Sequence, residues 1–414
     1  MSKLDDLIKE LCPNGVEYKT LGEVGKVCMC KRIMKNQTEP TGDIPFYKIG
    51  TFGKKADSFI SKELFEEYKS KFSFPKKGDI LISAAGTIGR TVIYDGAPAY
   101  YQDSNIVWID NDETEVLNKW LFYCYQTSPW QVSTGGTIAR LYNDNISKAK
   151  IPVPPLPVQE EIVRILDTFT SLTAELTAEL TAELTARRKQ YEYYKSLFFE
   201  DNGKYEIKHI TDIALVKARV GWQRLTTAEY LDSGEYYLIT GTDFQNGIIN
   251  FDTCHYVTKE RYDMDTNIQV HKDDILITKD GTLGKVAMLT EEPKKLATLN
   301  SGVFNIHVFD EKIFPRFIYH FFTSKTFTDF VVKVKTGSTI PHLTQQGLVT
   351  LNIPIPPFDE QKKIANTLDR FEFLCNDISS GLPAEIEARR KQYEYYRDLL
   401  LTFKPFVSTS LNEQ

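Results

Sequence analysis

The longest regular pattern of apolar and polar residues lies in the middle of the chain. From Val158 to Phe199 no glycine or proline interrupts the sequence, and the tetrapeptide TAEL occurs three times in succession between 173 and 184. The apolar residues recur at spacings of three and four, which is typical of one face of an α-helix. A proline-rich segment at 152–157 precedes this run, and proline is disfavoured inside helices. The pattern therefore predicts a single helix, about 63 Å long at about 1.5 Å per residue.

The same pattern returns 202 residues later in the chain. The segment ARRKQYEYY at 186–194 is repeated without change at 388–396, and IPVPPLPVQEEIVRILD at 151–167 matches IPIPPFDEQKKIANTLD at 353–369. The chain therefore contains two copies of one unit. We expect the two apolar stripes to pack against each other as an antiparallel, coiled-coil-like pair of spacer helices, unless each packs on the core of its own domain. The predicted seam consists of Leu166, Phe169, Leu172, Leu176, Leu180, Leu184, Leu368, Phe371, Leu374, Ile378, Leu382 and Ile386.

The second helical segment differs from the first at one place. Gly381, Leu382 and Pro383 stand where the first copy has an uninterrupted TAEL repeat. Proline inside a helix removes a backbone hydrogen bond and clashes with the preceding turn. We therefore expect the second helix to stop near Ser380 and to restart with Pro383 in its first turn.

The regions that precede the two helical segments have a mixed pattern. Short runs rich in strand formers, such as DILIS and NIVWI in the first copy and YYLIT and GVFNIHVF in the second, are bounded by turn residues. Amphipathic helical patterns follow late in each region. The predicted fold class is α+β, with two tandem domains held apart by the spacer helices and a pseudo-twofold internal repeat. The predicted boundaries are 1–150 for the first domain, 151–202 for the first spacer helix, 203–352 for the second domain, 353–403 for the second spacer helix and 404–414 for a flexible C-terminal tail.

The order of the copies also predicts where the chain ends lie. The first copy leads from YYKSLFFEDNG into YEIKHITDI, whereas the second copy ends at YYRDLLLTF. The sequence that would continue the second copy, NGVEYKTLGEV, stands at the N-terminus. We therefore expect the two ends of the chain to be neighbours in a closed ring.

Composition excludes some classes of function but does not identify a binding partner. A chain of 414 residues with 42% apolar content can form two or three cores. The net charge of -6 argues mildly against nucleic acid, although lysines and arginines cluster locally. The six cysteines have neither a disulfide nor a zinc spacing. The N-terminus lacks a secretory pattern and no run is long enough for a membrane span, so we expect a cytosolic protein.

The sequence shows little that would support catalysis. An adenine methyltransferase would need an NPPY-like tetrapeptide, and the nearest strings, PPLP and IPPF, lack its Asn or Asp. GTLGKV at 281–286 departs from the phosphate-loop pattern GxxxxGK[ST]. The nuclease-like string Glu67-Tyr68-Lys69 is of a kind that arises by chance in a charged loop. The six histidines include no i, i+4 pair, so no metal site is predicted.

Two pairs of polar loops remain as candidates for binding. GTIGR at 86–90 and GTLGK at 281–285 combine glycines, which allow close backbone approach, with a hydroxyl and a cation. TGGTIARL at 134–141 and TGSTIPHL at 336–343 have a similar character. Such groups suit contacts to phosphates or to base edges. For the glycines, the alternative that these are only fold-defining turns remains open.

Together these features resemble the specificity subunit of type I restriction-modification enzymes over essentially the whole chain. The resemblance rests on the alternating variable and repeated regions, the IPxPPxxxQxxIxxxLD segment, the TAEL repeats and the ending RRKQYEYYRDLL. It implies that each variable region is a target recognition domain that reads one half of a split site in double-stranded DNA. It also implies that two modification (methyltransferase) subunits and restriction (translocase/endonuclease) subunits assemble on a non-catalytic chain. S-adenosylmethionine, ATP and Mg would then bind the partners, and no cofactor would bind this chain.

The resemblance suggests roles for residues that the two copies share or vary. Arg is favoured for guanine edges and Lys for phosphates. The predicted DNA contacts are Thr87, Arg90, Thr137 and Arg140 in the first domain, and Lys217, Arg219, Lys279, Lys285, Thr339 and His342 in the second. The predicted subunit-interface residues, some of which could instead close the helix bundle, are Arg187, Arg188, Tyr191, Tyr194, Arg389, Arg390, Tyr393 and Tyr396.

The TAEL repeats suggest a ruler. In a helix, each tetrapeptide adds about 6 Å of length. We therefore hypothesise that the repeat number sets how many unread bases separate the two half-sites. Two other classes stay open, namely a coiled-coil adaptor that binds only protein and, less favoured, a self-contained methyltransferase or nuclease.

Overall fold

The computed structural model describes residues 2–132, 139–200, 203–220, 225–337, 341–376 and 380–407. The chain divides into two compact units. Unit 1 comprises Met1–Thr177 together with Ala388–Gln414, and unit 2 comprises Ala178–Glu387. Each unit has its own sheets, helices and apolar core, which confirms the predicted α+β class with two tandem domains.

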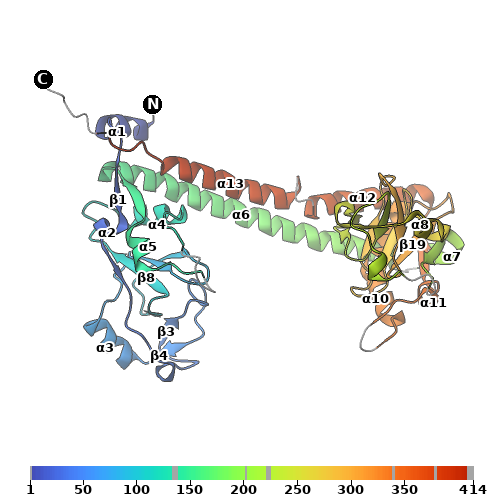
Figure 1. The fold of residues 1–414 in the computed structure, drawn as a ribbon, viewed down its shortest axis with the longest axis horizontal. Helices are drawn as coiled ribbons and strands as arrows, with labels where there is room; N and C mark the ends of the chain where they lie inside the picture. The colour runs from blue at the N-terminus through green and yellow to red at the C-terminus, as the bar shows by residue number, and fades with distance from the viewer. Residues whose placement is uncertain are drawn as a thin grey trace. The chain divides into compact units, whose positions relative to one another are not determined.

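Unit 1 is built around three small sheets (Figure 1). Its elements are α1 (Lys3–Leu11), β1 (Glu17–Thr20), α2 (Leu21–Val24), β2 (Lys26–Cys28), η1 (Lys35–Gln37), β3 (Ile44–Tyr47), β4 (Phe59–Ile60), α3 (Lys62–Lys71), β5 (Ile80–Ser83), β6 (Thr91–Ile93), β7 (Tyr100–Tyr101), β8 (Ile106–Asp110), α4 (Asn118–Gln126), α5 (Asn143–Ser147) and β9 (Lys150–Val153). The sheet orders are β2-β8-β5-β6, β4-β3-β7 and β1-β9. The inner strand β5 is buried along its whole length, which explains the apolar run ILI that begins it.

Unit 2 repeats this plan. Its elements are β10 (Glu206–His209), α7 (Ile210–Ile213), β11 (Ala214–Ala218), η3 (Thr227–Glu229), β12 (Tyr236–Ile239), β13 (Phe244–Gln245), β14 (Ile248–Ile249), η4 (Phe251–Thr253), β15 (His255–Val257), α8 (Lys259–Asp263), η5 (Thr266–Ile268), β16 (Ile275–Thr278), β17 (Val286–Met288), β18 (Leu296–Leu299), β19 (Val303–Val308), α9 (Pro315–Phe322), α10 (Lys325–Val334), α11 (Gln345–Leu348) and β20 (Asn352–Ile355). The sheet orders are β11-β19-β16-β17, β15-β12-β18, β10-β20 and β13-β14.

The strand pairing shows that the two units are copies. In each unit the three-stranded sheet contains one parallel pair, β3 with β7 in unit 1 and β12 with β18 in unit 2. The other pairs within the shared sheets are antiparallel. Unit 2 differs by the added hairpin β13-β14. The duplication seen in the sequence is therefore a duplication of the fold.

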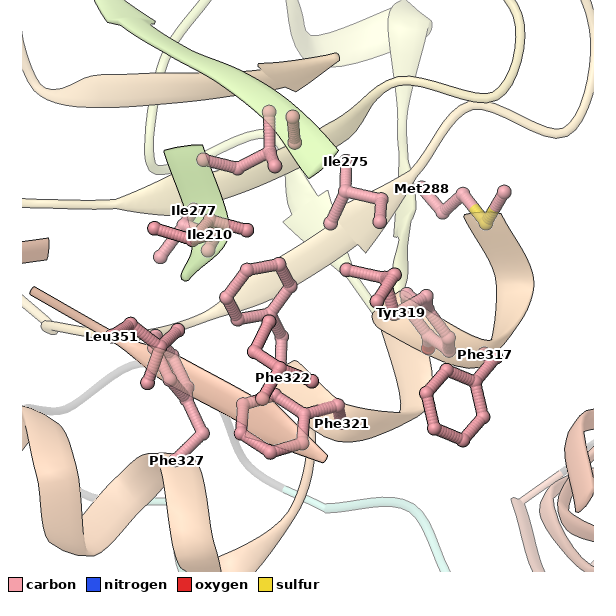
Figure 2. Close-up of a cluster of buried hydrophobic side chains, with 14 of the residues drawn as sticks. Ile210, Ile275, Ile277, Met288, Phe317, Tyr319, Phe321, Phe322, Phe327 and Leu351 are labelled. Carbon is pink, nitrogen blue, oxygen red and sulfur yellow. The ribbon is translucent and has the colours of Figure 1, made fainter. Parts of the chain in front are cut away.

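The core of unit 2 lies between its four-stranded sheet and the helices that follow it (Figure 2). Ile210, Ile275, Phe317 and Phe321 are completely buried in this cluster. Burying one such side chain contributes about 1.5–3 kcal/mol relative to leaving it in water. This core therefore fixes the helix α9, which in turn positions the polar residues described below.

The long helices largely confirm the sequence prediction. The helix α6 extends over Leu156–Phe199 without a break. The helix α12 is described over Phe358–Asn376, which ends before the predicted stop near Ser380, and 377–379 lie outside the described residues. The helix α13 (Leu382–Leu400) begins with Pro383 as its second residue, as predicted.

The predicted seam is only partly buried. Leu166 and Leu368 are fully buried, but each lies in the core of its own domain, as the alternative interpretation required. Phe169 and Leu172 are 38% and 56% exposed, so the prediction that they are buried is wrong. A pair of helices covers only one side of a wide apolar stripe, which leaves the remaining positions in contact with solvent. Ile378 lies outside the described residues.

The remaining seam positions are at least half-buried. They comprise Leu176, Leu180, Leu184, Phe371, Leu374, Leu382 and Ile386. Equivalent aromatic contacts join the helical segments inside each unit. The rings of Phe169 and Tyr396 lie 6.2 Å apart in unit 1, and those of Phe371 and Tyr194 lie 5.7 Å apart in unit 2.

The two ends of the chain meet inside unit 1. The N–H of Val16 donates to the carbonyl of Lys404 at 2.9 Å, and the N–H of Phe406 donates to the carbonyl of Val16 at 2.9 Å. This confirms that the chain ends are neighbours. Residues 404–407 are thus paired with backbone, and the prediction of a flexible tail is wrong for them. Residues 408–414 lie outside the described residues.

Candidate nucleic-acid interface

The loops GTIGR and GTLGK form the same turn in the two units. In unit 1 the hydroxyl of Ser83 accepts the N–H of Arg90 at 2.8 Å and donates to the carbonyl of Thr87. In unit 2 Thr278 takes the place of Ser83 and accepts the N–H of Lys285 at 2.9 Å. A buried hydroxyl therefore closes each turn, and the residue that follows the turn projects from it.

The glycines of these loops are required by the turn. Gly89 and Gly284 have φ values of 80° and 73°, and Gly86 and Gly281 have φ values of 64° and 69°. Residues with a Cβ atom adopt such values only at a cost in energy. The fold-defining interpretation of the glycines is therefore confirmed, while the side chains between them carry any binding role.

The predicted residues of the first domain lie near the ends of β5 and β8. Thr87 is exposed. The guanidinium of Arg90 donates to the backbone carbonyl of Phe52 at 2.8 Å. That of Arg140 donates to the carbonyl of Ser104 at 3.0 Å. Both arginines are half-buried, so each presents part of its side chain to solvent while a backbone contact holds it.

The predicted lysines of the second domain differ in exposure. Lys285 is exposed directly after the GTLGK turn. Lys217 in β11 is half-buried, and the ammonium of Lys279 lies 5.4 Å from the centre of the Phe304 ring. Thr137 and Thr339 lie outside the described residues.

Arg219 is buried, whereas the sequence predicts it to be a DNA contact. Its side chain is 2% exposed, and Nε donates to the carbonyl of Leu299 at 2.9 Å. Nη2 donates to the hydroxyl of Thr298 at 3.2 Å, whereas Nη1 has no partner among the described residues. Burial lowers the pKa of this guanidinium. Arg219 thus supports the sheet from inside and does not face solvent in this structure.

A pocket of about 920 Å³ opens beside the GTLGK turn of unit 2. We call it the second-domain pocket. Its polar lining residues include Thr226, Thr227, Tyr230, Thr240, Thr242, Asp280, Thr282, Lys285, Asn300 and Ser301. At its edge, Nδ1 of His342 pairs with Oδ1 of Asp280. Hydroxyl and amide groups thus outnumber charged groups in this pocket.

Unit 1 has a pocket of about 720 Å³ around Arg140. Ser104, Tyr142, Asn145 and Lys148 also line it. The guanidinium of Arg140 lies 5.9 Å from the centre of the Tyr142 ring. The two units therefore carry different side chains at related edges.

The structure reveals a buried glutamine in each unit that sequence analysis missed. The amide nitrogen of Gln159 donates to the carbonyls of Glu115 and Pro154, both at 2.7 Å, and its carbonyl accepts the N–H of Leu117 at 2.9 Å. Gln361 makes the equivalent three bonds with Phe314, Lys312 and Pro356. These bonds fasten the start of each long helix to its domain. The identity of this glutamine in the two copies was the signal that could have revealed it.

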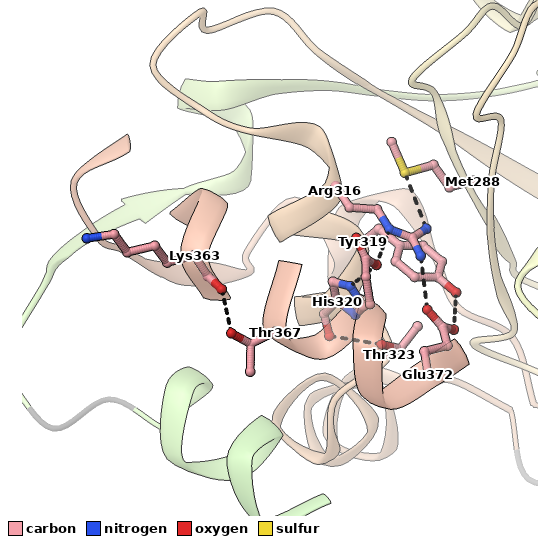
Figure 3. Close-up of polar contacts among 9 residues, drawn as sticks. Met288, Arg316, Tyr319, His320, Thr323, Lys363, Thr367 and Glu372 are labelled. Atoms are coloured by element: carbon pink, nitrogen blue, oxygen red, sulfur yellow. Dashed lines mark hydrogen bonds and ion pairs between the residues drawn. The ribbon is translucent and has the colours of Figure 1, made fainter. Parts of the chain in front are cut away.

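A second polar contact anchors α12 to α9 in unit 2 (Figure 3). Arg316 bonds Asp369 at 2.6 Å and Glu372 at 3.0 Å, and Nε2 of His320 lies 2.7 Å from the same carboxyl of Asp369. The phenol of Tyr319 donates to Glu372 at 2.9 Å.

Burial and neighbouring charges shift the pKa values of His320 and Asp369 in this cluster. Burial lowers the pKa of His320 despite the nearby carboxylates. Burial would favour the neutral form of Asp369, but His320 and Arg316 outweigh it and lower the pKa of that carboxyl. Ligand atoms of His320, Asp369 and Glu372 lie close enough together to hold a metal. Arg316 already neutralises these carboxylates, so we interpret the cluster as an anchor between helices.

The predicted interface residues divide into buried and exposed groups. Tyr191 is buried in unit 2, with its ring 6.2 Å from that of Phe371, and therefore closes the helix bundle. In unit 1, Tyr396 is 42% exposed and Tyr393 shares a hydrogen bond with Thr170 at 3.0 Å.

Three of the predicted interface arginines contact residues of their own helices, and Arg188 contacts another helix. Arg187 pairs with Glu183 at 3.4 Å and Arg390 with Glu394 at 3.1 Å. Arg188 donates to the carbonyl of Cys375 at 3.4 Å. Arg389 donates to Gln392 at 3.3 Å.

An open apolar groove lies between the helical segments of unit 1. We call it the helix groove, and its volume is about 220 Å³. Its lining comprises Phe169, Leu172, Thr173, Leu176, Arg389, Gln392, Tyr393 and Tyr396. Exposed aromatic and apolar side chains that line a groove are typical of protein interfaces.

Comparison with known proteins identifies the family. A family model described as Type I restriction modification DNA specificity domain matches the chain twice, over residues 13–186 and 202–388. The chain belongs to the family of type I restriction-modification specificity subunits. The two matched stretches coincide with the two copies found in the sequence, so the specificity subunit contains its family domain in duplicate.

Several curated proteins are similar to this specificity subunit. A putative type I restriction enzyme specificity subunit of Haemophilus influenzae is 64% identical over 43% of this chain, and the match spans 46% of that relative. The EcoR124I/EcoR124II specificity subunit of Escherichia coli is 34% identical over 70% of this chain and 72% of its own length. The EcoprrI specificity subunit of Escherichia coli is 29% identical over 92% of this chain and 93% of its own length.

Solved structures share the fold. A chain from a study of complex assembly and conformational transition of the type I restriction-modification system has a TM-score of 0.67, with 94% of this chain and 98% of that chain covered at 14% identity. The HsdS subunit of Thermoanaerobacter tengcongensis has a TM-score of 0.54 at 14% identity, with 94% and 96% covered. In the part of the specificity subunit that the structure describes, no helix is both long and apolar enough to cross a membrane.

Proposed function

We propose that each of the two domains reads one half of a split site in double-stranded DNA. The observation that carries this proposal is the shared turn, in which a hydroxyl accepts the same backbone N–H in both units, but which presents Arg90 in one and Lys285 in the other. A common backbone with different exposed side chains is what two readers of different sequences require. Base edges are read by such side chains, while backbone and phosphate contacts set the position.

The exposed edges of the two domains supply groups suited to this task. Thr87, Arg90 and Arg140 in the first domain, and Lys279, Lys285 and His342 in the second, remain our predicted contacts. Arginine forms paired hydrogen bonds with guanine, and lysine acts as a point charge toward phosphate. Lys217 is half-buried and Arg219 is buried, so we assign Arg219 a supporting role for the sheet.

We further propose that the repeated helices bind the catalytic partners. The helix groove of unit 1 offers apolar surface that the chain itself does not cover. The duplicated sequence would suit two modification subunits, which would meet different surfaces because the counterpart of Tyr393 in unit 2, Tyr191, is buried; restriction subunits would join the same complex. S-adenosylmethionine, ATP and Mg would then bind to those partner subunits. The assembled complex would be cytoplasmic.

The gap between the half-sites would depend on the TAEL repeats. The helix α6 is continuous through all three repeats. Four residues add about 6 Å and rotate a helix by about 40° beyond a full turn. Deleting Thr177 to Leu180 should therefore change the gap while leaving both half-site sequences as they were.

Single-molecule sequencing of modified bases in host DNA would test both proposals. The complex with the intact chain should give one split motif, and the deletion should give the same two half-sites with a different gap. Thr177→Ala, which keeps the helix length, is the matched control and should leave the gap unchanged. Altered half-sites with the original gap would contradict the ruler, and the absence of any gene-dependent motif would contradict half-site reading itself.

A further inference from the structure

The second-domain pocket contains an unusual carboxylate. Among its described lining residues, Lys285 is the one cation and Asp280 the one anion, and the other polar groups are hydroxyls and amides. A surface that follows the phosphate backbone would instead gather several lysines and arginines. The pocket therefore has the composition of a surface that contacts bases.

Asp280 is held so that one oxygen stays available. It follows β16, and its side chain is 43% exposed. Oδ1 pairs with Nδ1 of His342. No hydrogen bond to Oδ2 is formed by any other described residue. The imidazole thus fixes the carboxylate while Oδ2 remains open to the pocket.

The two domains can be aligned at this position through their backbone bonds. The N–H of Ala84 donates to the carbonyl of Asn105 at 2.7 Å, and the N–H of Lys279 donates to the carbonyl of Gly302 at 2.9 Å. Asp280 therefore corresponds to the residue after Ala84.

In the first domain that residue is Ala85, which has no hydrogen-bonding side chain. The neighbouring segment gives the same alignment, since the N–H groups of Leu141 and Leu343 donate to the carbonyls of Ala84 and Lys279 respectively. The fold therefore does not require a carboxylate here. Its presence in the second domain alone indicates a role in what that domain binds.

The chemistry of DNA limits this role. Phosphates repel a carboxylate, whereas exocyclic amino groups donate to it. In the major groove only cytosine N4 and adenine N6 present such donors. Guanine and thymine present acceptors at the corresponding positions, which would face Oδ2 without a proton between them.

We propose that Asp280 is a specificity-determining residue of the second domain, whose carboxylate accepts a hydrogen bond from the exocyclic amino group of a cytosine or adenine. His342 acts as its positioning residue. This inference rests on the proposed function of half-site reading. It places the pocket against the major groove and adds the base class that one strand must carry at one position of the second half-site.

The test uses the chain assembled with the modification subunits that co-purify with it. Initial rates of methyl transfer are measured on a set of duplexes in which each position of the second half-site carries each of the four base pairs. The variants are Asp280→Ala, which copies the residue of the first domain and removes the acceptor, and His342→Asn. Glu311→Gln is the matched control, because it removes one exposed negative charge from the same unit outside the pocket.

The intact complex should discriminate at one position by about 10-fold or more in favour of cytosine or adenine on one strand. Asp280→Ala should reduce this preference at that position alone, and His342→Asn should reduce it less. Glu311→Gln should keep the wild-type pattern. The base preferred by the intact complex distinguishes the cytosine amino group from that of adenine.

Two results would overturn the assignment. One is a wild-type base preference at every position in Asp280→Ala, which would mean that the carboxylate reads nothing. The other is an equal loss of rate on all duplexes, with the thermal unfolding midpoint unchanged, which would indicate general DNA binding. If the intact complex showed no preference at any position, half-site reading would fail before Asp280 could be judged.

Discussion

In each unit the domain contacts its long helix, and some of these contacts are the same in both units while others differ. Gln159 and Gln361 form the same three backbone bonds at the start of α6 and of α12. About two turns later the contacts diverge. Asp167 binds Lys119 and Tyr123 in unit 1, whereas its counterpart in unit 2 binds an arginine and a histidine.

This difference shows which contacts the fold constrains. A bond to backbone atoms depends on the path of the chain, so it persists as long as the turn is kept. A bond between side chains can be replaced by another pair of similar reach. The contacts around Asp167 in unit 1 and around Asp369 in unit 2, which we call the two anchors, thus hold the long helices in the same way with different side chains. They should respond differently to mutation, to backbone strain and to pH.

The largest expected difference concerns the cations of the two anchors. Arg316 is held by two carboxylates at 23% exposure, whereas Lys119 is 52% exposed beside one. Arg316→Ala should destabilise unit 2 by about 2–3 kcal/mol, because partly buried carboxylates lose their partner. Lys119→Ala should cost unit 1 less than about 1 kcal/mol.

Hydrogen exchange followed by mass spectrometry would report the two units separately through peptides from α9 and α4. Faster exchange is expected in α9 of Arg316→Ala, with little change in α4 of Lys119→Ala. Equal effects in the two variants would show that the anchors are energetically the same.

The shared turn provides a second comparison. Gly89 and Gly284 both have positive φ, but a Cβ at Gly89 would lie 3.2 Å from the ring of Trp130, whereas the nearest atom at Gly284 is 3.8 Å away. Gly284→Ala should cost about 1 kcal/mol from backbone strain. Gly89→Ala should cost about 2 kcal/mol, since crowding adds to the strain.

Thermal unfolding of the purified chain would measure both changes. Gly50→Ala is the control, because no atom lies within 4 Å of its Cβ position, and it should leave the midpoint almost unchanged. A larger loss in Gly284→Ala than in Gly89→Ala would contradict the role of Trp130.

The smallest expected effect is a pH dependence confined to unit 2. Burial lowers the pKa of His320 below its ordinary value, so the unfolded chain binds the proton first as the solution is acidified. The stability that neutral His320 contributes is fully present above about pH 6.5. It decreases as the pH falls from there to the pKa of His320 in the folded chain, by at most about 1.4 kcal/mol per pH unit. The pKa of Asp369 is lowered by His320 and Arg316, so this carboxyl stays ionised between about pH 7.5 and pH 5.5.

The substitution His320→Tyr would copy the tyrosine found at the equivalent position 123. The drop in melting temperature of unit 2 between about pH 7.5 and pH 5.5 should become smaller in this variant. Tyr123→Phe in unit 1 serves as a control and should leave that pH response as in the wild type. An unchanged response in His320→Tyr would mean that another group titrates.

The sequence predicted those parts of the fold that leave a local or repeated signal. The duplication, the uninterrupted helix over Val158 to Phe199 and the restart at Pro383 follow from identity, periodicity and proline chemistry. The burial of Arg219 did not follow, because the direction of one cation depends on the sheet around it.

The burial of the predicted seam was overestimated for a related reason. Helical spacing shows that Phe169 and Leu172 share a face, but it does not show whether this chain or another protein covers that face. The candidate DNA contacts stay predictions. Their loops could be located from the sequence, whereas the pairing of Asp280 with His342 depends on two segments that only the fold brings together.

The pairing of Val16 with Lys404 and Phe406 has a consequence for synthesis of the protein. Unit 2 is one continuous stretch and can complete its core while the chain is still being made. Unit 1 needs Leu401, which is buried in its core, and so must wait for a segment made after all of unit 2. The first domain to emerge from the ribosome is therefore the last that can finish folding.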